Sequence, residues 1–456
     1  MKQRMKRVLG VTSLVSCLAL MLSGCVRGSS TTVSSETITM WRPTTSAAEQ
    51  DYFSKHFVDA YNVTNPKNPI KVIFRDWSTA AQLQQTAVAS GSGPDIIYTP
   101  GPSSALSYLA AGELLPLDKY GDKYGWTSKF QPWALDVGKY KDQLYLIPET
   151  YETMLMVYLP KVFKSHGWDV PVDSASFNRL IKDAHGAGMI PITSGSKSWP
   201  ATTEHLLSVA INNIAGPDAV YSALSGKKKW TDPEFVDAIS TVKQWFADGT
   251  IAGGANRYFS TTVDDNYRNL TDGKAATYWN GSWAFQEVGA SFHKNDQTGD
   301  WDWSLVPSLS SRVSTAPVSI GIGRTMAINA KSKNPDGAAE YINWLVSDPK
   351  AQLEKTQTVG VAPIPLKFKD SDFPSSMDPR VKRLYETIDN AKSIGYLSWT
   401  FLPPKTNQYF YREMDKVIVG DLSVQDYLAG LQSIFDGELK AGLVPPLPKP
   451  AGGTGS

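Results

Sequence analysis

Cysteine and histidine are scarce in this sequence. Its 456 residues contain two cysteines, Cys17 and Cys25, and five histidines. Two cysteines this close to the N-terminus exclude a disulfide framework as the source of stability, which must therefore come from a hydrophobic core. So few histidines leave little material for a metal site, and we expect neither a metal ion nor another cofactor.

Long apolar runs are also absent. The most apolar segment, residues 8–22, has 15 residues, fewer than the ~20 that a membrane-spanning helix needs. Four basic residues and no acidic residue precede it. A basic start, a short apolar middle and small residues before a cleavage point are typical of a secretory signal peptide.

The apolar segment ends at Leu22-Ser23-Gly24-Cys25, which resembles the lipobox of bacterial lipoproteins. There the cysteine carries lipid, such as palmitate, and becomes the mature N-terminus. An ordinary signal peptide that happens to contain a cysteine is the alternative. We predict a lipoprotein signal peptide over residues 1–24, a lipid on Cys25 and a flexible Ser/Thr-rich tether over residues 25–36. The protein would then be anchored at the extracellular face of the cell membrane, or at its periplasmic face in a host with two membranes.

The remaining chain has no excess of positive charge. Removal of residues 1–24 takes four of the 45 basic residues and none of the 44 acidic ones, which leaves a formal net charge of −3. Nucleic acid is therefore not an expected partner. The length of the remaining chain exceeds what one hydrophobic core usually serves, so we expect two lobes.

Strand and helix patterns alternate in the first third of the chain. "ETITMW", "IKVIFRDW" and "GPDIIYT" read as strands, and the two segments between them have helical spacing of apolar residues. Such an order predicts an α/β fold with a parallel sheet and helices on both of its faces. The middle of the chain, from about residue 146 to 299, is richer in helices.

Several stretches in a fixed order resemble a known family. They include "ASGSGPDIIYT", "YKDQLYLIPETYETMLMVYLP", "LTDGKAATYWNGSWAF" and "NAKSKNPDGAAEYINWLVSDP". Together they resemble the extracellular solute-binding proteins of ATP-driven (ABC) importers, and most of all the carbohydrate-binding family that includes maltose-binding protein. The resemblance runs from residue 37 to about residue 437.

The resemblance implies a two-lobed Venus-flytrap fold with a hinge of several crossings. The N-terminal lobe would comprise residues 37–147 and 306–346, and the C-terminal lobe residues 148–305 and 347–445. Residues 446–456 would form a disordered tail. Ligand would be clamped between the lobes, and the protein would act as a monomer.

A sugar site needs flat aromatic faces for the rings and fixed polar groups for the hydroxyls. In "YWNGSWAF" the resemblance assigns Trp283 to the cleft. Trp279 either lines the cleft or lies in the core beneath it. Asn280 either donates to a sugar hydroxyl or shapes the turn.

The segment "LIPETYETMLMVY" holds the second group of candidates. The resemblance implies that Glu152 faces ligand at a hinge crossing, with Glu149 and Tyr151 as near neighbours. In a strand, Glu152 and Thr150 share one face while Tyr151 points to the other.

The other candidates lie near the expected cleft, because ligands of open α/β sheets bind beyond the carboxyl ends of the strands. Trp199 belongs to an expected loop, Arg324 to a glycine-rich strand, and either of two aromatics near the C-terminus would stack on a sugar. The candidates of this group are Trp41, Arg42, Asp76, Trp77, Trp199, Arg324, Tyr396 and Trp399.

The resulting hypothesis is a binding protein, not an enzyme, that captures an oligosaccharide and delivers it to the membrane subunits of an ABC permease. One alternative keeps the fold and binds a peptide or polyol. Another is a secreted glycoside hydrolase, which would need two carboxyl groups about 5–10 Å apart, such as Glu149 and Glu152.

Overall fold

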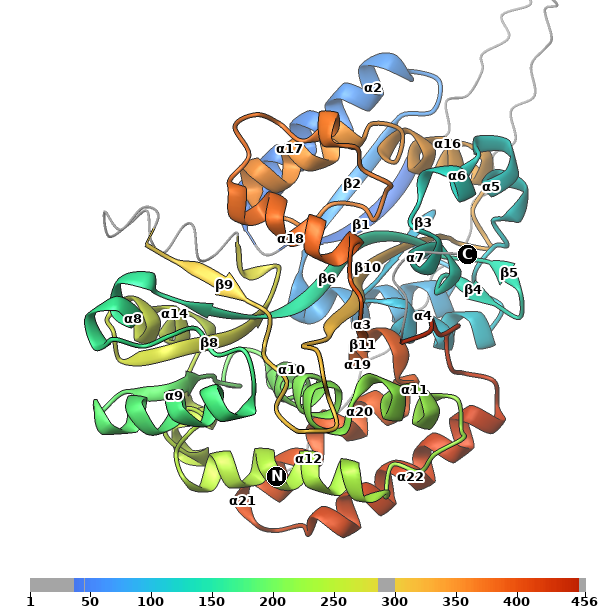
Figure 1. The fold of residues 1–456 in the computed structure, drawn as a ribbon. Helices are drawn as coiled ribbons and strands as arrows, with labels where there is room; N and C mark the ends of the chain where they lie inside the picture. Colours follow the sequence, from blue (N-terminus) through green and yellow to red (C-terminus); the bar gives the residue numbers. More distant parts are fainter. Residues whose placement is uncertain (1–36, 45, 286–299, 451–456) are drawn as a thin grey trace, which may run out of the picture. The chain divides into compact units, whose positions relative to one another are not determined.

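The computed structural model describes residues 37–44, 46–285 and 300–450 (Figure 1). The predicted signal peptide, Cys25, the tether and the end of the predicted tail lie outside these residues. No helix in the described part of the chain is both long enough and apolar enough to cross a bilayer.

The first three strands form the predicted parallel arrangement. Strand β1 (Ile38–Thr44) lies between β2 (Ile70–Asp76) and β3 (Ile96–Thr99) and runs parallel to both. All four residues of β3 are buried, as expected for a strand covered on both faces. This arrangement confirms the predicted α/β fold class.

Two long strands connect the parts of the sheet. Strand β10 (Val318–Ile328) pairs antiparallel with β3 and with β6 (Ile147–Tyr158). The second half of β6 pairs with β8 (Ala275–Gly281) and β9 (Asp302–Ser304). The resulting strand order is β2-β1-β3-β10-β6-β8-β7, where β7 is Ile190–Thr193, and β11 (Ile394–Tyr396) pairs with β10.

The helices surround this sheet (Figure 1). The elements before β6 are α1 (Ala47–Phe53), the π-helical η1 (Ser54–Asp59), α2 (Ala60–Thr64), α3 (Trp77–Ala89), α4 (Pro102–Ala110), α5 (Asp118–Tyr124), α6 (Trp126–Lys129), α7 (Pro132–Asp136) and the hairpin β4 (Lys139–Tyr140) with β5 (Gln143–Leu144). Between β6 and β8 lie α8 (Pro160–His166), α9 (Ser174–Gly186), η2 (Pro200–Thr202), α10 (Thr203–Ala210), η3 (Ile211–Ala215), α11 (Pro217–Leu224), α12 (Pro233–Ala247), α13 (Ala255–Ser260) and α14 (Val263–Thr271). After β10 come α16 (Pro335–Leu345), α17 (Pro349–Val359), η4 (Asp370–Asp372), α18 (Pro379–Asp389), α19 (Ser398–Phe401), α20 (Pro404–Arg412), α21 (Met414–Val419) and α22 (Val424–Lys440).

Strand β6 begins in one hydrophobic cluster and ends in another. Ile147 belongs to a cluster with Met40 of β1 and Tyr341 of α16. Leu155 belongs to a larger cluster with Phe235 of α12 and other residues of the middle and C-terminal segments. The strand thus carries the chain from one core into the other.

The predicted lobe boundary at residue 347 stays a prediction. The second part of the C-terminal lobe was expected to start at residue 347, but the next helix, α17, contacts α1. Ile364 and Leu366 are also buried in the cluster that contains Met40. Asp348 caps α17 directly after α16. Leu353 of α17 is buried in the larger cluster that contains Leu155, so this helix contributes to the second core while it contacts α1.

Candidate functional site

A bulge in β10 shapes the candidate site. Ile322 pairs with Tyr151 and Arg324 pairs with Thr150, so Gly323 is an extra residue opposite β6. A bulge bends the strand and redirects the side chains beside it. The carboxyl group of Glu152 lies over the backbone of Gly323, in the space that a larger residue would fill.

The residues of β6 alternate as the sequence predicts for a strand. Thr150 donates a hydrogen bond to Oε1 of Glu152 over 3.3 Å, so the two side chains meet on one face. Tyr151 is fully buried and its ring centroid lies 5.2 Å from that of Tyr385. Glu149 accepts a hydrogen bond from Arg42. Of the three predicted residues, Glu152 is the one whose carboxyl group lies over Gly323 at the bulge.

Four buried charged residues form a network at the carboxyl end of β1. Arg42 pairs with Glu149 and, over 3.3 Å, with Glu49 of α1. Arg324 pairs with the same oxygen of Glu49 over 2.6 Å. The guanidinium of Arg42 also lies 3.9 Å from the ring centroid of Phe53. Two positive and two negative charges balance here, which is the condition under which charges tolerate burial.

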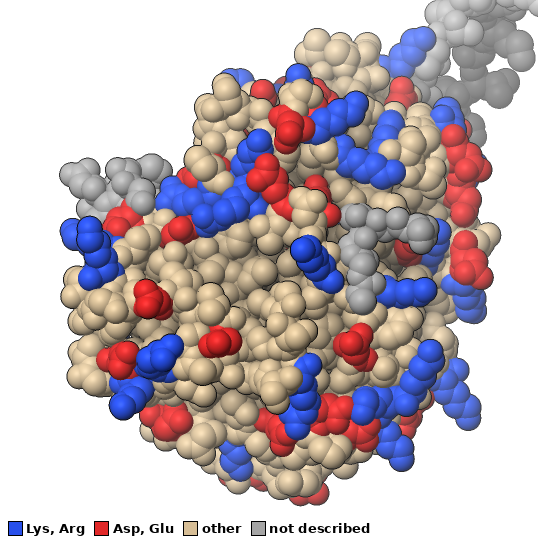
Figure 2. Space-filling model, in the orientation of Figure 1, with Lys and Arg blue, Asp and Glu red and all other residues tan. Residues whose placement is uncertain are grey.

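The pKa values at this network reflect both burial and neighbouring charge. Burial alone would raise the pKa of Glu149, but Arg42, Arg324 and Lys355 hold it below its usual value. Burial lowers the pKa of Lys355 to about 7, although Glu149 opposes this shift. On the visible face of the molecule, basic and acidic side chains are interspersed and reach solvent (Figure 2).

Three rings gather near Glu152. The ring centroid of His205, on α10, lies 5.0 Å from Trp283 and 5.4 Å from Trp399, and the two tryptophans are 5.7 Å apart. We call Trp283, Trp399 and His205 the aromatic group. Trp283 and His205 are half-buried, whereas Trp399 is 8% exposed. The three residues of the aromatic group come from distant parts of the chain.

Burial favours the uncharged form of the titratable groups beside the aromatic group. Burial raises the pKa of Glu152 to about 7, against the opposing effects of Arg324, Thr150 and the indole N–H of Trp399. Burial also raises the pKa of Glu204 to about 7 and lowers the pKa of His205 to about 4. Nε1 of Trp399 is buried and has no hydrogen-bond partner of good geometry among the described residues.

Three predicted residues lie in packed surroundings. Trp279 is 2% exposed and its ring packs against Phe177 and Trp245. Asn280 donates to the hydroxyl of Tyr267 and accepts from the backbone N–H of Gly281, so it shapes the turn. Tyr396 is 1% exposed and donates its hydroxyl hydrogen to the carbonyl of Pro448. Of the two alternatives left open for Tyr396 and Trp399, the structure brings only Trp399 to the aromatic group.

The remaining predicted residues lie apart from these groups. Trp41 is half-buried, with the guanidinium of Arg75 4.8 Å from its ring centroid. Asp76 is exposed at the end of β2, and the side chain of Trp77 lies outside the described part of the structure. Trp199 is half-buried, and its carbonyl accepts a hydrogen bond from Thr202.

Sequence reasoning missed Glu49, Glu204, His205 and Lys355. Glu204 and His205 are adjacent on α10, and Glu204 accepts a hydrogen bond from Asn407 over 3.0 Å. The only sequence feature that could have indicated a site on α10 was a Glu-His pair beside an apolar helical segment. Nothing in the local sequence distinguishes the buried Glu49 or Lys355 from a surface charge. No cluster of metal-ligating residues occurs among the residues that the structure describes.

Solved structures show the same fold. The chain superposes on a chitin oligosaccharide binding protein with a TM-score of 0.76 and 18% identity, over 88% of this chain and 98% of that one. For a protein of xylan utilization from the thermophilic bacterium Caldanaerobius polysaccharolyticus the TM-score is 0.74 and the identity 20%, over 88% and 100% of the two chains. For maltose-bound MalE3 of T. maritima the values are 0.71 and 16%, over 88% and 99%.

Comparison with curated protein sequences finds no significant match. The model of the bacterial extracellular solute-binding protein family matches residues 45–352, which is more than half of the chain. That segment contains β6, the bulge in β10, three of the four residues of the charge network (Glu49, Glu149 and Arg324), Trp283 and His205. This chain therefore belongs to the bacterial extracellular solute-binding protein family.

Proposed function

We propose that this protein is the substrate-binding component of an ABC importer and that its ligand is an oligosaccharide. The observation that carries the proposal is the aromatic group with Glu152 beside it. Aromatic faces suit the C–H faces of sugar rings, and a carboxyl group with an indole N–H suits neighbouring hydroxyls. The similar structures named for a chitin oligosaccharide and for maltose support the same ligand class.

The buried charge network holds one wall of the proposed site in place. The side chains of Arg42 and Glu149 are each at most 3% exposed, so we assign them to holding the ends of β1 and β6 in place and not to ligand contact. Ligand that contacts elements on both sides of β6 would favour the closed arrangement of the protein, which the permease then recognises. Delivery to a permease follows from the proposed role as a receptor.

The contacts of Glu149 argue against a glycoside hydrolase. A hydrolase needs two carboxyl groups across one glycosidic bond. Glu149 is paired with Arg42, whereas Glu152 lies over Gly323. The carboxylate of Glu149 is therefore already engaged in a buried ion pair.

The test is a ligand screen by calorimetry and thermal shift. Chito-, xylo- and malto-oligosaccharides would be compared with mixed peptides and with polyols. A ligand that binds the native state raises the melting temperature by mass action. We expect one oligosaccharide series to do so, and Trp283→Ala to abolish the shift.

Trp168→Ala is the matched control. Trp168 is also half-buried, but it packs on Phe163 and His166 beside α8, outside the aromatic group. The control should retain the full ligand response. A response to peptides alone would refute the carbohydrate assignment, and steady release of shorter sugars would refute the binding role.

We further propose that lipid on Cys25 anchors the protein outside the cell membrane. The lipobox-like sequence before Cys25 supports this, and the anchor would raise the effective concentration of the receptor near its permease. Cells grown with a palmitate analogue should label the wild-type protein, whereas Cys25→Ala should be unlabelled. Labelling of that variant would refute the anchor at this position.

A further inference from the structure

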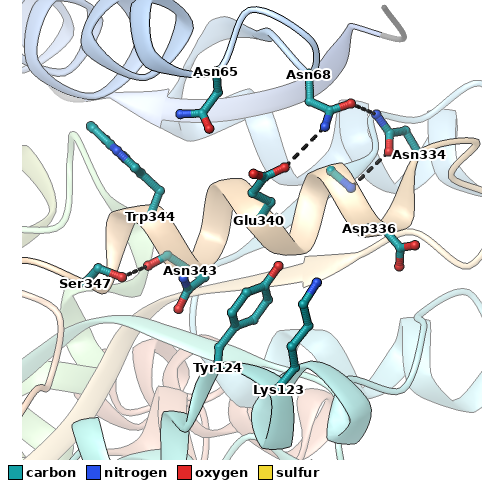
Figure 3. A pocket seen from close by; sticks show the side chains of 11 residues that line it. Asn65, Asn68, Lys123, Tyr124, Asn334, Asp336, Glu340, Asn343, Trp344 and Ser347 are labelled. Atoms are coloured by element: carbon teal, nitrogen blue, oxygen red, sulfur yellow. Dashed lines mark hydrogen bonds between the residues drawn. The ribbon is translucent and has the colours of Figure 1, made fainter. Parts of the chain in front are cut away.

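A pocket outside the candidate site lies beside α16. Its volume is about 510 Å³, within the ~300–1,000 Å³ that is typical of ligand pockets. Residues of α16, of the end of α5 and of the segment after α2 line it, and Figure 3 shows their side chains. None of them belongs to the aromatic group or to the charge network.

Hydrogen bonds orient the carboxylate in this pocket before any ligand arrives. Asn334 donates to Oδ1 of Asn68, and Asn68 donates to Oε2 of Glu340 over 3.2 Å (Figure 3). Oε1 of Glu340 takes no hydrogen bond from the described residues. Glu340 and Asn65 extend toward one another across the pocket (Figure 3). Fixed polar groups of this kind reduce the entropy that binding costs.

Hydrogen bonds also orient the side-chain amide of Asn343, which lines the same pocket. Oδ1 of Asn343 accepts hydrogen bonds from Nε1 of Trp126 over 3.3 Å and from Nζ of Lys129 over 3.1 Å. The amide nitrogen of Asn343, a double donor, makes no hydrogen bond to the described residues. The pocket thus presents both an acceptor, Glu340, and a donor, Asn343.

A buried hydroxyl without a partner lies next to the pocket. Tyr61 is 0% exposed, and its hydroxyl has no hydrogen-bond partner among the described residues. Burial raises the pKa of Tyr61, and Glu340 and Tyr124, which both line the pocket, raise it further. An unsatisfied buried hydroxyl costs free energy, so such a group needs an explanation.

Aromatic side chains complete the lining. Trp344 of α16 is half-buried and packs on Tyr61, with ring centroids 5.6 Å apart. Tyr124 is half-buried and stacks on Trp126 at 5.8 Å. The charged groups of the lining are Lys123, Asp336 and Glu340, a balance that disfavours an anionic ligand.

We propose that the pocket between α16, the end of α5 and the segment after α2 is a second binding site, which holds one neutral sugar ring. Glu340 accepts from ring hydroxyls, and Asn343 donates to them. Trp344 supplies the apolar surface. The site does not depend on the proposed function of the cleft.

The test uses fluorine NMR of the full protein labelled with 5-fluorotryptophan. Glucose, N-acetylglucosamine and xylose serve as separate probes, and a Trp344→Phe variant assigns the resonance of Trp344. We expect at least one probe to shift that resonance in a saturable way. Trp283→Ala should keep this response, because Trp283 does not line the pocket. In the wild-type protein, the resonances of Trp283 and Trp399 report ligand binding in the cleft separately.

Two variants test the chemistry of the pocket. Glu340→Gln should weaken binding at Trp344 by about three- to tenfold, as expected for the loss of one hydrogen bond. Tyr61→Phe should keep the binding, because the hydroxyl of Tyr61 does not line the pocket. Tyr61→Phe should leave the melting temperature of the free protein unchanged or higher, because the hydroxyl it removes has no partner.

Three results would overturn the second site. The first is a Trp344 resonance that responds to none of the three sugars, and the second is one that responds to peptides instead of sugars. The third result is a Trp344 response that is lost in Trp283→Ala and unchanged in Glu340→Gln, which would show an effect transmitted from the cleft. A response of Trp283 without one of Trp344 would refute the second site and leave the proposed function intact.

Discussion

The carboxyl group of Glu152 occupies the space in which residue 323 would carry a side chain. A Cβ atom built on Gly323 would lie 1.8 Å from Oε1 of Glu152. Glycine at the bulge of β10 is therefore what allows the carboxyl group to lie beside the aromatic group.

Replacing this glycine should displace Glu152. We expect Gly323→Ala to lower the free energy of unfolding by about 1–3 kcal/mol through overpacking, and to weaken ligand binding. Urea denaturation and calorimetry measure the two effects. Gly437→Ala on α22 is the control, because its Cβ would meet no atom within 4 Å, and it should stabilise the helix by about 0.5–1 kcal/mol. Equal behaviour of the two variants would contradict this account.

Glu152 should make stability fall as the pH rises. Its pKa is about 7 in the folded protein against an ordinary value of 4.5, so the folded state holds the proton more tightly. The resulting stabilisation is complete below pH 4.5 and is lost as the pH rises through about 7. It amounts to about 3 kcal/mol.

The difference between wild type and Glu152→Gln isolates this contribution. His205, with its pKa lowered to about 4, acts in the opposite direction and Glu204 in the same one, but both are present in each protein. Urea denaturation from pH 4 to 8 should show Glu152→Gln gaining stability relative to wild type as the pH rises. The exposed Glu386→Gln should run parallel to wild type, and a parallel profile for Glu152→Gln would disprove the assignment.

Glu149 should be needed to keep Arg42 in the core. Glu149→Gln leaves a fully buried guanidinium with one carboxylate fewer, which should cost about 3–5 kcal/mol in urea denaturation. Replacing both Arg42 and Glu149 by methionine should cost less than the sum of the single methionine variants, because no charge is then left without its partner. Additive losses would mean that the two residues are not coupled.

Trp279 should contribute to stability and not to binding. Trp279→Ala removes a core ring that packs on Phe177 and Trp245, and should lower the free energy of unfolding by about 3–5 kcal/mol. Calorimetry below its melting temperature should give the ligand affinity of wild type. A large loss of affinity with intact folding would place Trp279 in the cleft.

Local patterns in the sequence were sufficient for the first part of the fold. Alternating apolar residues predicted β1 and β2, and a short apolar run predicted β3, because each pattern depends only on neighbouring residues. The crossing strand β6 was also expected near Ile147. The sequence did not indicate that α17, after the helix break at Asp348, contacts α1 while its Leu353 is buried in the second core, because these contacts join residues distant in the chain.

The candidate site divides in the same way. Period-two alternation placed Thr150 and Glu152 on one face, and the structure shows their hydrogen bond. The sequence could not separate Trp279 from Trp283, four residues apart, because burial depends on what packs against each ring. Nor could it indicate that Glu49 meets Arg42 and Arg324, or that His205 meets Trp399.

The sequence alone determined the chain's α/β class, its family and the segments that contain the site, because these depend on local periodicity and on the order of motifs. The tertiary structure decided which side chains meet. The bulge at Gly323 aims Glu152, the packing of α10 and α19 assembles the aromatic group, and burial sets the pKa values of Glu152 and His205. Contacts, desolvation and charge pairing arise only when residues distant in the chain come together.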